Sequence, residues 1–189
     1  RYGSYLYILR RDFIKKIAKI SNEMHKKLTG NNEELLITYK NQINLTDEDT
    51  VKDAKDKLLS KLESNRQRDI ETRMTKYGIH KDDLNIFIND LDVKLYGSQG
   101  QQRTASISLK LSEIELIKQE VNDNPVLILD DVFSELDETR QKLLVENLGD
   151  VQMFITSAEL AHKRIFDESE TAIFYIDKGK VTNIEDGGN

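Results

Sequence analysis

The sequence contains no cysteine among its 189 residues, which excludes disulfide bonds and thiolate metal sites. It also lacks any apolar run approaching the roughly 20 residues that span a bilayer. Its first segment is basic and amphipathic, without the compact apolar block of a signal peptide, so we expect no membrane partner. Apolar residues make up only 38% of the chain and charged residues 33%, which favours a globular core with long exposed helices.

A phosphate-binding P-loop is missing as well. That loop requires the pattern G-x-x-x-x-G-K-[ST]. The only glycine followed by lysine is Gly179, and it precedes Lys180 and Val181 in an expected hairpin. We therefore expect that this polypeptide alone neither binds ATP tightly nor hydrolyses it.

The net charge of −6 is unevenly distributed along the chain. The first 30 residues carry eight lysines and arginines against Asp12 and Glu23, a local balance of +6 that leaves −12 for the remainder. Binding of nucleic acid would therefore depend on local basic surface. The lysines are interspersed along an expected helix at 4–29. They form either a solvated face, which we favour, or a surface for DNA or a partner.

Hydrophobic periodicity and turn residues predict the other elements. A second helix is expected from a cap at Thr46 to Lys76, and a β-hairpin around Asn89 and Asp90. The other expected helices are 102–120, 138–147 and 160–166, and the other expected strands are 36–39, 126–129, 151–156, 172–176 and 181–184. Alternating helices and strands from residue 98 onward indicate a mixed α/β fold. We expect a helical subdomain at 1–76 and an α/β lobe at 77–189.

Two aspartates follow one of the expected strands. Residues 126–129 form an apolar run typical of a strand buried on both faces, and Asp130 and Asp131 follow it directly. Parallel α/β sheets bind ligands just outside this carboxyl end. A hydrated Mg²⁺ on a nucleotide phosphate would neutralise two adjacent acids there. The alternative is a buried strand that exits into an acidic turn.

Three motifs occur in a specific order. The sequence GSQGQQRT at 97–104, the strand ending in Asp130 and Asp131, and SELD at 134–137 resemble the signature motif, Walker B motif and D-loop of ABC-type ATPase heads, in the branch of SMC-like DNA-repair proteins. Within that branch, YGIHKDDL at 77–84 and the QGQQRT form of the signature are similar to the bacterial RecF family. The resemblance is specific over 77–184, and for 1–76 it rests on order and helical texture. It implies a C-terminal portion without the Walker A region.

The chain departs from the family at one of these motifs. RecF proteins usually show GPHRDD where this chain has Ile79 in place of proline and Lys81 in place of arginine. Lysine cannot form the two-pronged contact that an arginine fork makes. The exchange at position 81 is therefore expected to weaken a bidentate contact there.

The resemblance assigns Ser98, Gly100 and Gln101 to nucleotide binding in trans, where they would contact the γ-phosphate of ATP held by the opposite subunit. The residues alone also predict a capping box between Ser98 and Gln101. A helix N-terminus that glycine allows to be approached closely is an anion site as well. The two interpretations are compatible.

The same resemblance assigns roles to the acids and the next strand. Asp130 would order Mg²⁺ through water, and Asp131 would position or deprotonate the attacking water. Asp137 of the D-loop would lie at the dimer seam, or it would only cap the following helix. Thr156 or Ser157 would be the switch residue that senses the γ-phosphate, or merely a polar end of the strand.

The fold implied is a partial ABC-type ATPase head with parallel strands flanked by helices, plus a helical arm. The complete protein would be a cytoplasmic, weak ATPase that uses ATP and Mg²⁺, forms a homodimer on ATP, and binds gapped DNA or single/double-strand junctions. It would load RecA with RecO and RecR in recombinational repair, replication and the SOS response. Two alternatives stay open: another SMC-like or overcoming-lysogenisation-type ATPase head, and a nucleotide-independent protein-interaction fragment.

Overall fold

The computed structural model describes residues 2–121, 124–148, 151–166 and 170–186. The chain divides into two compact units, 1–121 and 122–189, and each is described by itself. This boundary lies after Val121 and not after residue 76, because a strand beyond residue 76 pairs with one before it. A functional division after residue 76 stays a prediction.

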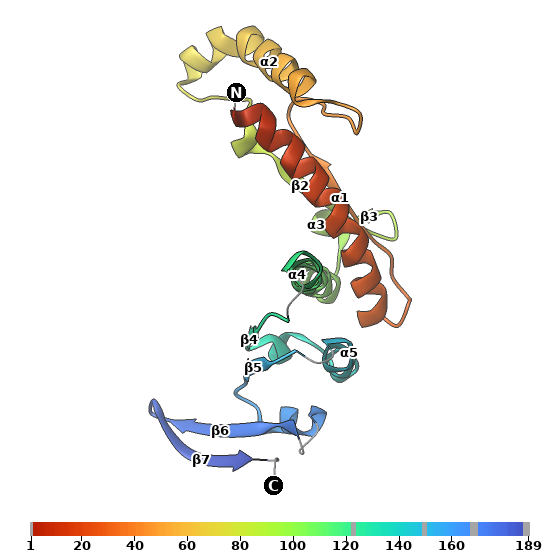
Figure 1. Cartoon of the computed structure of the whole chain (residues 1–189), viewed down its shortest axis with the longest axis vertical. Coiled ribbons are helices and arrows are strands. Elements are labelled where there is room, and N and C mark those ends of the chain that lie inside the picture. Colours follow the sequence, from red (N-terminus) through yellow and green to blue (C-terminus); the bar gives the residue numbers. More distant parts are fainter. Residues whose placement is uncertain (1, 122–123, 149–150, 167–169, 187–189) are drawn as a thin grey trace. The chain divides into compact units, whose positions relative to one another are not determined.

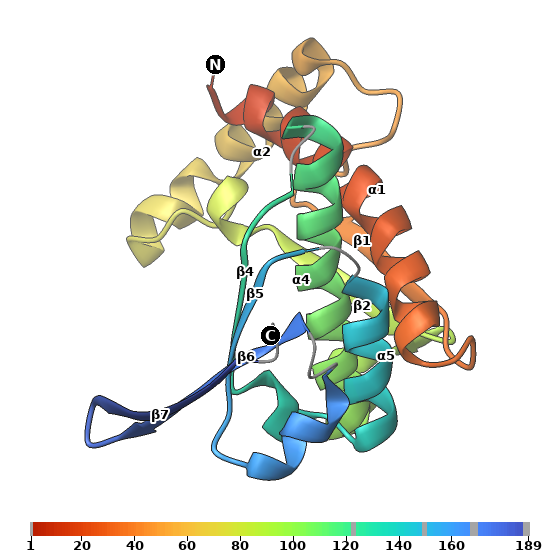
Figure 2. The ribbon, with the colours of Figure 1, turned by 60° about the horizontal axis from the view of Figure 1, so that its bottom comes forward.

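The first unit is built around the long helix α1, Tyr2–Leu28. It confirms the helix expected at 4–29, and it ends where Gly30 and Asn31 take positive φ angles of 60° and 62°. Helix α4, Gln99–Val121, confirms the helix expected at 102–120 and starts three residues earlier. α1 packs against α4 and against strand β1, Leu35–Lys40, and both views of the ribbon show α1 and α4 close together (Figures 1 and 2).

A three-stranded antiparallel sheet lies beside α1. β1 pairs with β2, Asp83–Ile88, from Leu35 opposite Ile88 to Lys40 opposite Asp83, and β2 turns into β3, Leu91–Asp92. The expected hairpin is confirmed, with Asn89 and Asp90 both at positive φ in its turn. Its second strand is shorter than predicted because the Asp92 carboxylate accepts from two following backbone N–H groups. That cap starts the helical turn α3, Val93–Tyr96.

The second helix, α2, spans Val51–Thr72, so both of its predicted ends are wrong. Thr50 is the cap, in a reciprocal capping box with Asp53. Thr46 instead donates its backbone N–H to the Asp49 carboxylate at 2.5 Å, in a separate turn. The helix ends because Arg73 adopts a left-handed conformation and its N–H returns to carbonyls of the last turn.

Two apolar clusters hold the first unit together. One joins α1, the sheet and α4, and its buried members are Leu35, Ile37, Ile88, Val93 and Ala105. The other lies between α1 and α2, and its buried members are Tyr7, Ile43 and Ala54. The sheet and α4 are thereby anchored to the same face of α1, which fixes where α4 begins relative to the loop after α1.

A buried polar cluster adjoins the second of these. Asp82, just after the short helix η1, Ile79–Lys81, accepts the Tyr39 hydroxyl at 2.5 Å and the Arg10 guanidinium at 3.2 Å. Burial raises the pKa of the Asp82 carboxyl. Burial and the neighbouring Asp82 carboxylate raise the pKa of Tyr7 to about 12. Tyr7 is fully enclosed, with 0% of its surface exposed.

This cluster predicts alkaline destabilisation. Between pH 10 and 12 the folded state keeps the Tyr7 proton that an unfolded chain loses, so stability falls as pH rises, by up to about 1.4 kcal/mol per unit. Phenolate absorbance and urea unfolding at pH 9–11 would measure both effects. Tyr7→Phe should leave the phenolate signal below pH 11 unchanged and make the loss of stability less steep. If Tyr7→Phe lowered the phenolate absorbance near pH 10, Tyr7 would already ionise there in the folded protein, and the raised pKa of Tyr7 would be contradicted.

The second unit contains the parallel pair that the α/β prediction requires. β4, Leu127–Asp130, pairs with β5, Met153–Thr156, in a register that places Asp130 opposite Thr156. The other elements are the 3₁₀ helices η2 (Val132–Glu135) and η3 (Leu160–Ile165), helix α5 (Glu138–Leu148), and the hairpin of β6 (Ala172–Asp177) with β7 (Lys180–Asp186). These confirm the expected order of elements and the mixed α/β class.

One expectation about β4 is wrong. The strand is not buried on both faces: Ile128 is 72% exposed and the preceding Val126 54% exposed, and on β5 Phe154 is 55% exposed. The reason is that within the described part of the second unit only β5 pairs with β4, and no element of this unit covers that face. The buried residues of the second unit instead include Phe133 and Leu144, with at most 1% exposure.

Candidate nucleotide-binding site

The N-terminus of α4 carries the predicted signature residues. The Ser98 hydroxyl accepts the Gln101 backbone N–H at 3.2 Å, and the side-chain oxygen Oε1 of Gln101 accepts the Ser98 backbone N–H at 3.0 Å. This reciprocal pair is the capping box that the sequence predicted. Ser98 and Gly100 are exposed. The first N–H groups of a helix have no intrahelical partners, so this exposed end offers donors to an anion.

A chain of polar contacts lies behind Gln101, and the sequence did not reveal it. Gln101 Nε2 donates to Glu33 Oε1 at 3.0 Å. The other oxygen of Glu33 contacts His25 Nε2 at 3.2 Å, and His25 Nδ1 contacts the Ser108 hydroxyl at 2.9 Å. His25 and Ser108 are fully buried. The N-terminus of α4 is therefore tied to α1 and to the loop that follows α1.

A repeat at helical spacing would have signalled this contact. Thr104, Ser108 and Ser112 recur every four residues on α4, and Ser21 and His25 do so on α1. All five are buried where the two helices pack, and Ser21 meets Ser112 at 2.7 Å. A stripe of hydroxyl residues on α4 and a polar stripe on α1 thus predict a pair of facing helices, because buried polar groups require partners.

The acidic edge of β4 meets β5 in the second unit. The Thr156 hydroxyl donates to Asp130 Oδ1 at 2.5 Å and accepts the Asp131 backbone N–H at 3.0 Å. Thr156 thus bonds both aspartates, through the carboxylate of one and the backbone of the other. The hydroxyl of Ser157 instead contacts His162 at 2.6 Å. Of the two switch candidates, only Thr156 contacts the acidic edge.

Asp131 has an unusual backbone for a residue with a side chain. Its φ is 50°, in the left-handed region, which aspartate and asparagine adopt more readily than most residues. Its exposed carboxylate accepts the Ser134 hydroxyl at 3.0 Å. The turn therefore directs Asp131 away from the line of β4 and leaves its second oxygen available to a ligand.

Asp137 caps α5, as the simpler of its two interpretations predicted. Its carboxylate accepts the Arg140 backbone N–H at 3.0 Å and also pairs with the Arg140 guanidinium. The N–H contact, and after it the guanidinium, lower the pKa of Asp137. The predicted role at a dimer seam stays a prediction.

The segment that contains Ser134 and Asp137 is held from behind by Gln141. Gln141 is 5% exposed, and its amide donates to the carbonyls of Phe133 at 2.8 Å and Leu136 at 2.9 Å. Those carbonyls lie on either side of residues 134 and 135. The shape of the predicted D-loop is therefore set by α5.

The predicted site residues fall into two groups, one in each unit: Ser98, Gly100 and Gln101 in the first, and Asp130, Asp131, Asp137 and Thr156 in the second. Within the described residues, no cluster of three His, Cys, Asp or Glu side chains is arranged to hold a metal ion. In the same part of the chain, no helix is both long and apolar enough to cross a membrane.

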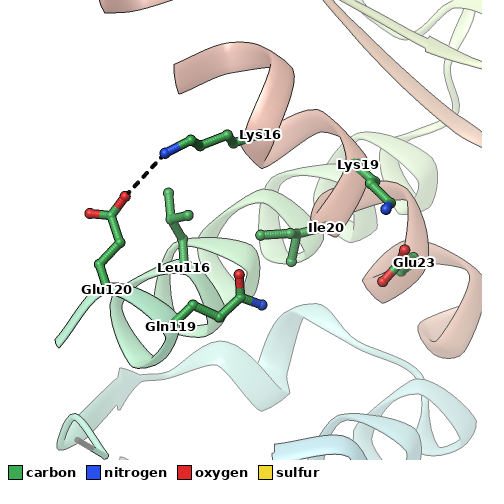
Figure 3. Close-up of a pocket in the computed structure, with 7 residues that line it drawn as sticks. All are labelled: Lys16, Lys19, Ile20, Glu23, Leu116, Gln119 and Glu120. Atoms are coloured by element: carbon green, nitrogen blue, oxygen red, sulfur yellow. Dashed lines mark ion pairs between the residues drawn. The ribbon is translucent and has the colours of Figure 1, made fainter. Parts of the chain in front are cut away.

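A shallow groove of about 480 Å³ lies between α1 and α4, away from these residues (Figure 3). Its lining mixes two lysines and two glutamates with Ile20, Leu116 and Gln119. Lys16 pairs with Glu120 across it. Because its charges balance, the groove has no preference for an anion or a cation, and the candidate site remains with the exposed motif residues.

No protein-family model matches the chain. It is 71% identical, over all 189 of its residues, to the DNA replication and repair protein RecF of Clostridioides difficile (strain 630), and covers 51% of that protein. It is 45% identical to RecF of Alkaliphilus oremlandii (strain OhILAs) over 95% of the chain and 49% of the relative. The chain thus spans about half the length of the curated relatives it matches.

The fold also matches solved structures. One, described as the recombination mediator protein RecF-ATPrS in the RecFOR pathway, aligns with a TM-score of 0.75 and 34% identity over 85% of this chain and 43% of that one. A second, described as RecF-ATP in the same pathway, gives 0.74 and 35% over 84% and 42%. At these identities the likeness extends to sequence as well as fold.

Proposed function

Because the chain belongs to the RecF family, we propose that it supplies part of an ATP-dependent DNA-binding protein of recombinational repair. In this proposal ATP joins two subunits into a homodimer. Ser98, Gly100 and Gln101 of one subunit contact the γ-phosphate of ATP held by the other. The dimer then binds gapped or junction DNA and, with RecO and RecR, helps to load RecA.

The observation that carries the proposal is the exposed, capped N-terminus of α4. The Ser98–Gln101 capping box fixes the first turn and occupies the N–H groups of Ser98 and Gln101, while the N–H groups of the exposed residues Gln99 and Gly100 have no intrahelical partner. An anion at this point gains hydrogen bonds and a favourable helix dipole. Since the γ-phosphate would come from a second subunit, Ser98 and Asp130 of one chain need not lie together.

The acidic edge fits the other half of such a pocket. Asp130 and Thr156 present oxygen atoms, the ligand type that Mg²⁺ prefers, and Asp130 would hold the ion through water. The bound ion would neutralise charge on the phosphates. Asp131 would position or deprotonate the attacking water. Because phosphoryl transfer depends mainly on positioning and charge, a short aspartate in this role is consistent with slow turnover.

Dimerisation driven by ATP is the direct test. ATP that bridges two subunits stabilises only the dimer, so its addition shifts the equilibrium by mass action. The full-length protein should sediment as a monomer without nucleotide and with ADP, and as a dimer with ATP. A sedimentation coefficient that ATP leaves unchanged would overturn the proposal and favour a nucleotide-independent interaction module.

Two basic segments of the chain are candidates for the DNA contact. On α1, Lys15, Lys16 and Lys26 form ion pairs, which agrees with the solvated face favoured from the sequence. The segment 61–81 instead carries six lysines and arginines against three acids, leaving +3. The six cations are Lys61, Arg66, Arg68, Arg73, Lys76 and Lys81. Lys61 and Arg68, which share one face of α2, and Lys76, which meets Lys61 at the Tyr77 ring, define the α2 basic surface. Across the described residues, no ion pair involves any of them.

The α2 basic surface also includes an aromatic ring. The ammonium groups of Lys61 and Lys76 both lie 5.3 Å from the centre of the Tyr77 ring. Unpaired cations beside an aromatic side chain are suited to phosphates and stacked bases. We therefore place the DNA contact on this surface and not on α1.

Replacing Lys61 and Arg68, which share one face of α2, together by alanine should weaken DNA binding by the ATP-bound full-length protein. Each lost phosphate contact lowers the slope of log K against log salt by about 0.9 on duplex DNA, so the pair should lower it by about 2. Fluorescence anisotropy over a salt series measures this. The matched control is Lys15→Ala with Lys16→Ala, whose cations are already paired. An equal effect of both pairs would contradict the placement.

A further inference from the structure

The side chain of Gln101 is fixed at both ends of its amide. Its oxygen accepts the Ser98 N–H at 3.0 Å, and its nitrogen donates to Glu33 Oε1 at 3.0 Å. An amide nitrogen carries two hydrogens. With one hydrogen donated to Glu33, the other has a defined direction, so the orientation of Gln101 depends on a residue outside its own helix.

Glu33 is in turn held by His25. Its second oxygen contacts His25 Nε2 at 3.2 Å, and the side chain of Glu33 is only 17% exposed. A carboxylate accepts hydrogen bonds and does not donate them, so His25 is the donor in this contact when Nε2 carries a hydrogen. His25 itself is fully buried and contacts Ser108 on α4. Glu33 therefore has one oxygen for each neighbour and little freedom to rotate.

The pairing also addresses a problem of charge. A bare carboxylate beside a helix N-terminus that receives a phosphate would repel that phosphate. A hydrogen bond from His25 Nε2 to the Glu33 carboxylate offsets part of the negative charge of that carboxylate. Glu33 can thus orient Gln101 while its charge is partly compensated from the interior.

We propose that Glu33, supported by His25, is a positioning residue for Gln101. It holds the Gln101 side chain at the N-terminus of α4 in the orientation that contacts ATP held by a second subunit. This inference rests on the proposed ATP-dependent dimer. Glu33 contacts neither nucleotide nor metal in it. Its effect passes through one hydrogen bond to Gln101, so it should change assembly of the dimer and leave ATP binding to the monomer alone.

The test uses the full-length protein with substitutions at this loop. Glu33→Ala removes the acceptor, and Glu33→Gln keeps one: its carbonyl still accepts from Gln101, while its NH₂ can donate to His25 after a change of tautomer. The matched control is Glu34→Ala, since the neighbouring Glu34 pairs with Lys26 on the exposed side and does not contact α4. Sedimentation gives the dimer affinity with ATP, and a fluorescent ATP analogue gives nucleotide affinity at concentrations where the protein is monomeric.

Glu33→Ala should weaken the ATP-bound dimer about tenfold, the scale of one hydrogen bond to a charged group, with monomer affinity for ATP unchanged. Glu33→Gln should restore the dimer, and Glu34→Ala should match the wild type. In a Gln101→Ala background, Glu33→Ala should have no further effect. Equal losses for Glu33→Ala and Glu34→Ala, or no loss for Glu33→Ala in a wild type that dimerises, would overturn this inference alone. A wild type that ATP does not dimerise would overturn the proposed function.

Discussion

Replacing Ser98 by arginine in the full-length protein should abolish ATP-dependent dimerisation. We expect the dimer affinity to fall by at least about 100-fold, the result of burying an unpaired cation and a long side chain where two subunits meet. Sedimentation with ATP would measure the loss. Nucleotide binding by the monomer should persist, because in the proposed dimer Ser98 contacts only the ATP held by the other subunit.

The structure supports this substitution as a clean test. Ser98 is exposed, so an arginine there meets solvent and not the core of the monomer. Loss of the cap costs about 1 kcal/mol of helix stability, and α4 remains anchored by buried residues such as Leu111. Ser98→Ala isolates that cost, and Ser106→Arg places the same charge on an exposed serine further along α4. If Ser106→Arg also prevented dimerisation, the effect could not be assigned to the signature motif.

Replacing Asp131 by asparagine should reduce ATP hydrolysis by the full-length protein by at least about 100-fold, the usual contribution of a general base. Asparagine has the same shape and accepts the left-handed backbone at this position, where φ is 50°. It can still bond the Ser134 hydroxyl through its side-chain oxygen. The ATP-bound dimer should therefore form normally and persist longer, since hydrolysis no longer releases it.

Phosphate release, measured together with dimer lifetime, separates chemistry from assembly for this variant. The matched control is Asp177→Asn, which changes an exposed acid of the β6–β7 hairpin. Hydrolysis by Asp131→Asn within about twofold of the wild type would exclude Asp131 as the base, because loss of a real base costs far more. A loss of dimerisation would instead indicate a structural role.

Local patterns were sufficient where one segment determines the structure. The capping box of Ser98 and Gln101 followed from residue type and spacing alone, and so did the cap at Asp137. Local patterns misplaced the start of α2 because Thr46 and Thr50 are each followed three residues later by an aspartate. Both pairs form, but only the second leads into a helix. Two equivalent signals cannot be ranked without the packing of Ala54 against α1.

Contacts between distant segments were beyond prediction. The pairing of β1 with β2 joins strands separated by the whole of α2, and nothing local specifies that register. The Thr156–Asp130 bond follows from the register of β4 and β5, which the sequence left open although it named both residues. The Gln101–Glu33–His25 contacts require three segments to meet. Burial of β4 was overestimated because an apolar run cannot show what covers it.

Because Gln141 donates to two backbone carbonyls, few other residues can replace it. Glutamate would set a negative oxygen against two carbonyl oxygens, and asparagine is one methylene too short to reach them from the same place on α5. Hydrophobic replacements would remove the donor from both carbonyls and leave the Phe133 carbonyl with only the Leu136 N–H. A substitution at position 141 should thus distort a loop several residues upstream, although no residue of that loop is replaced.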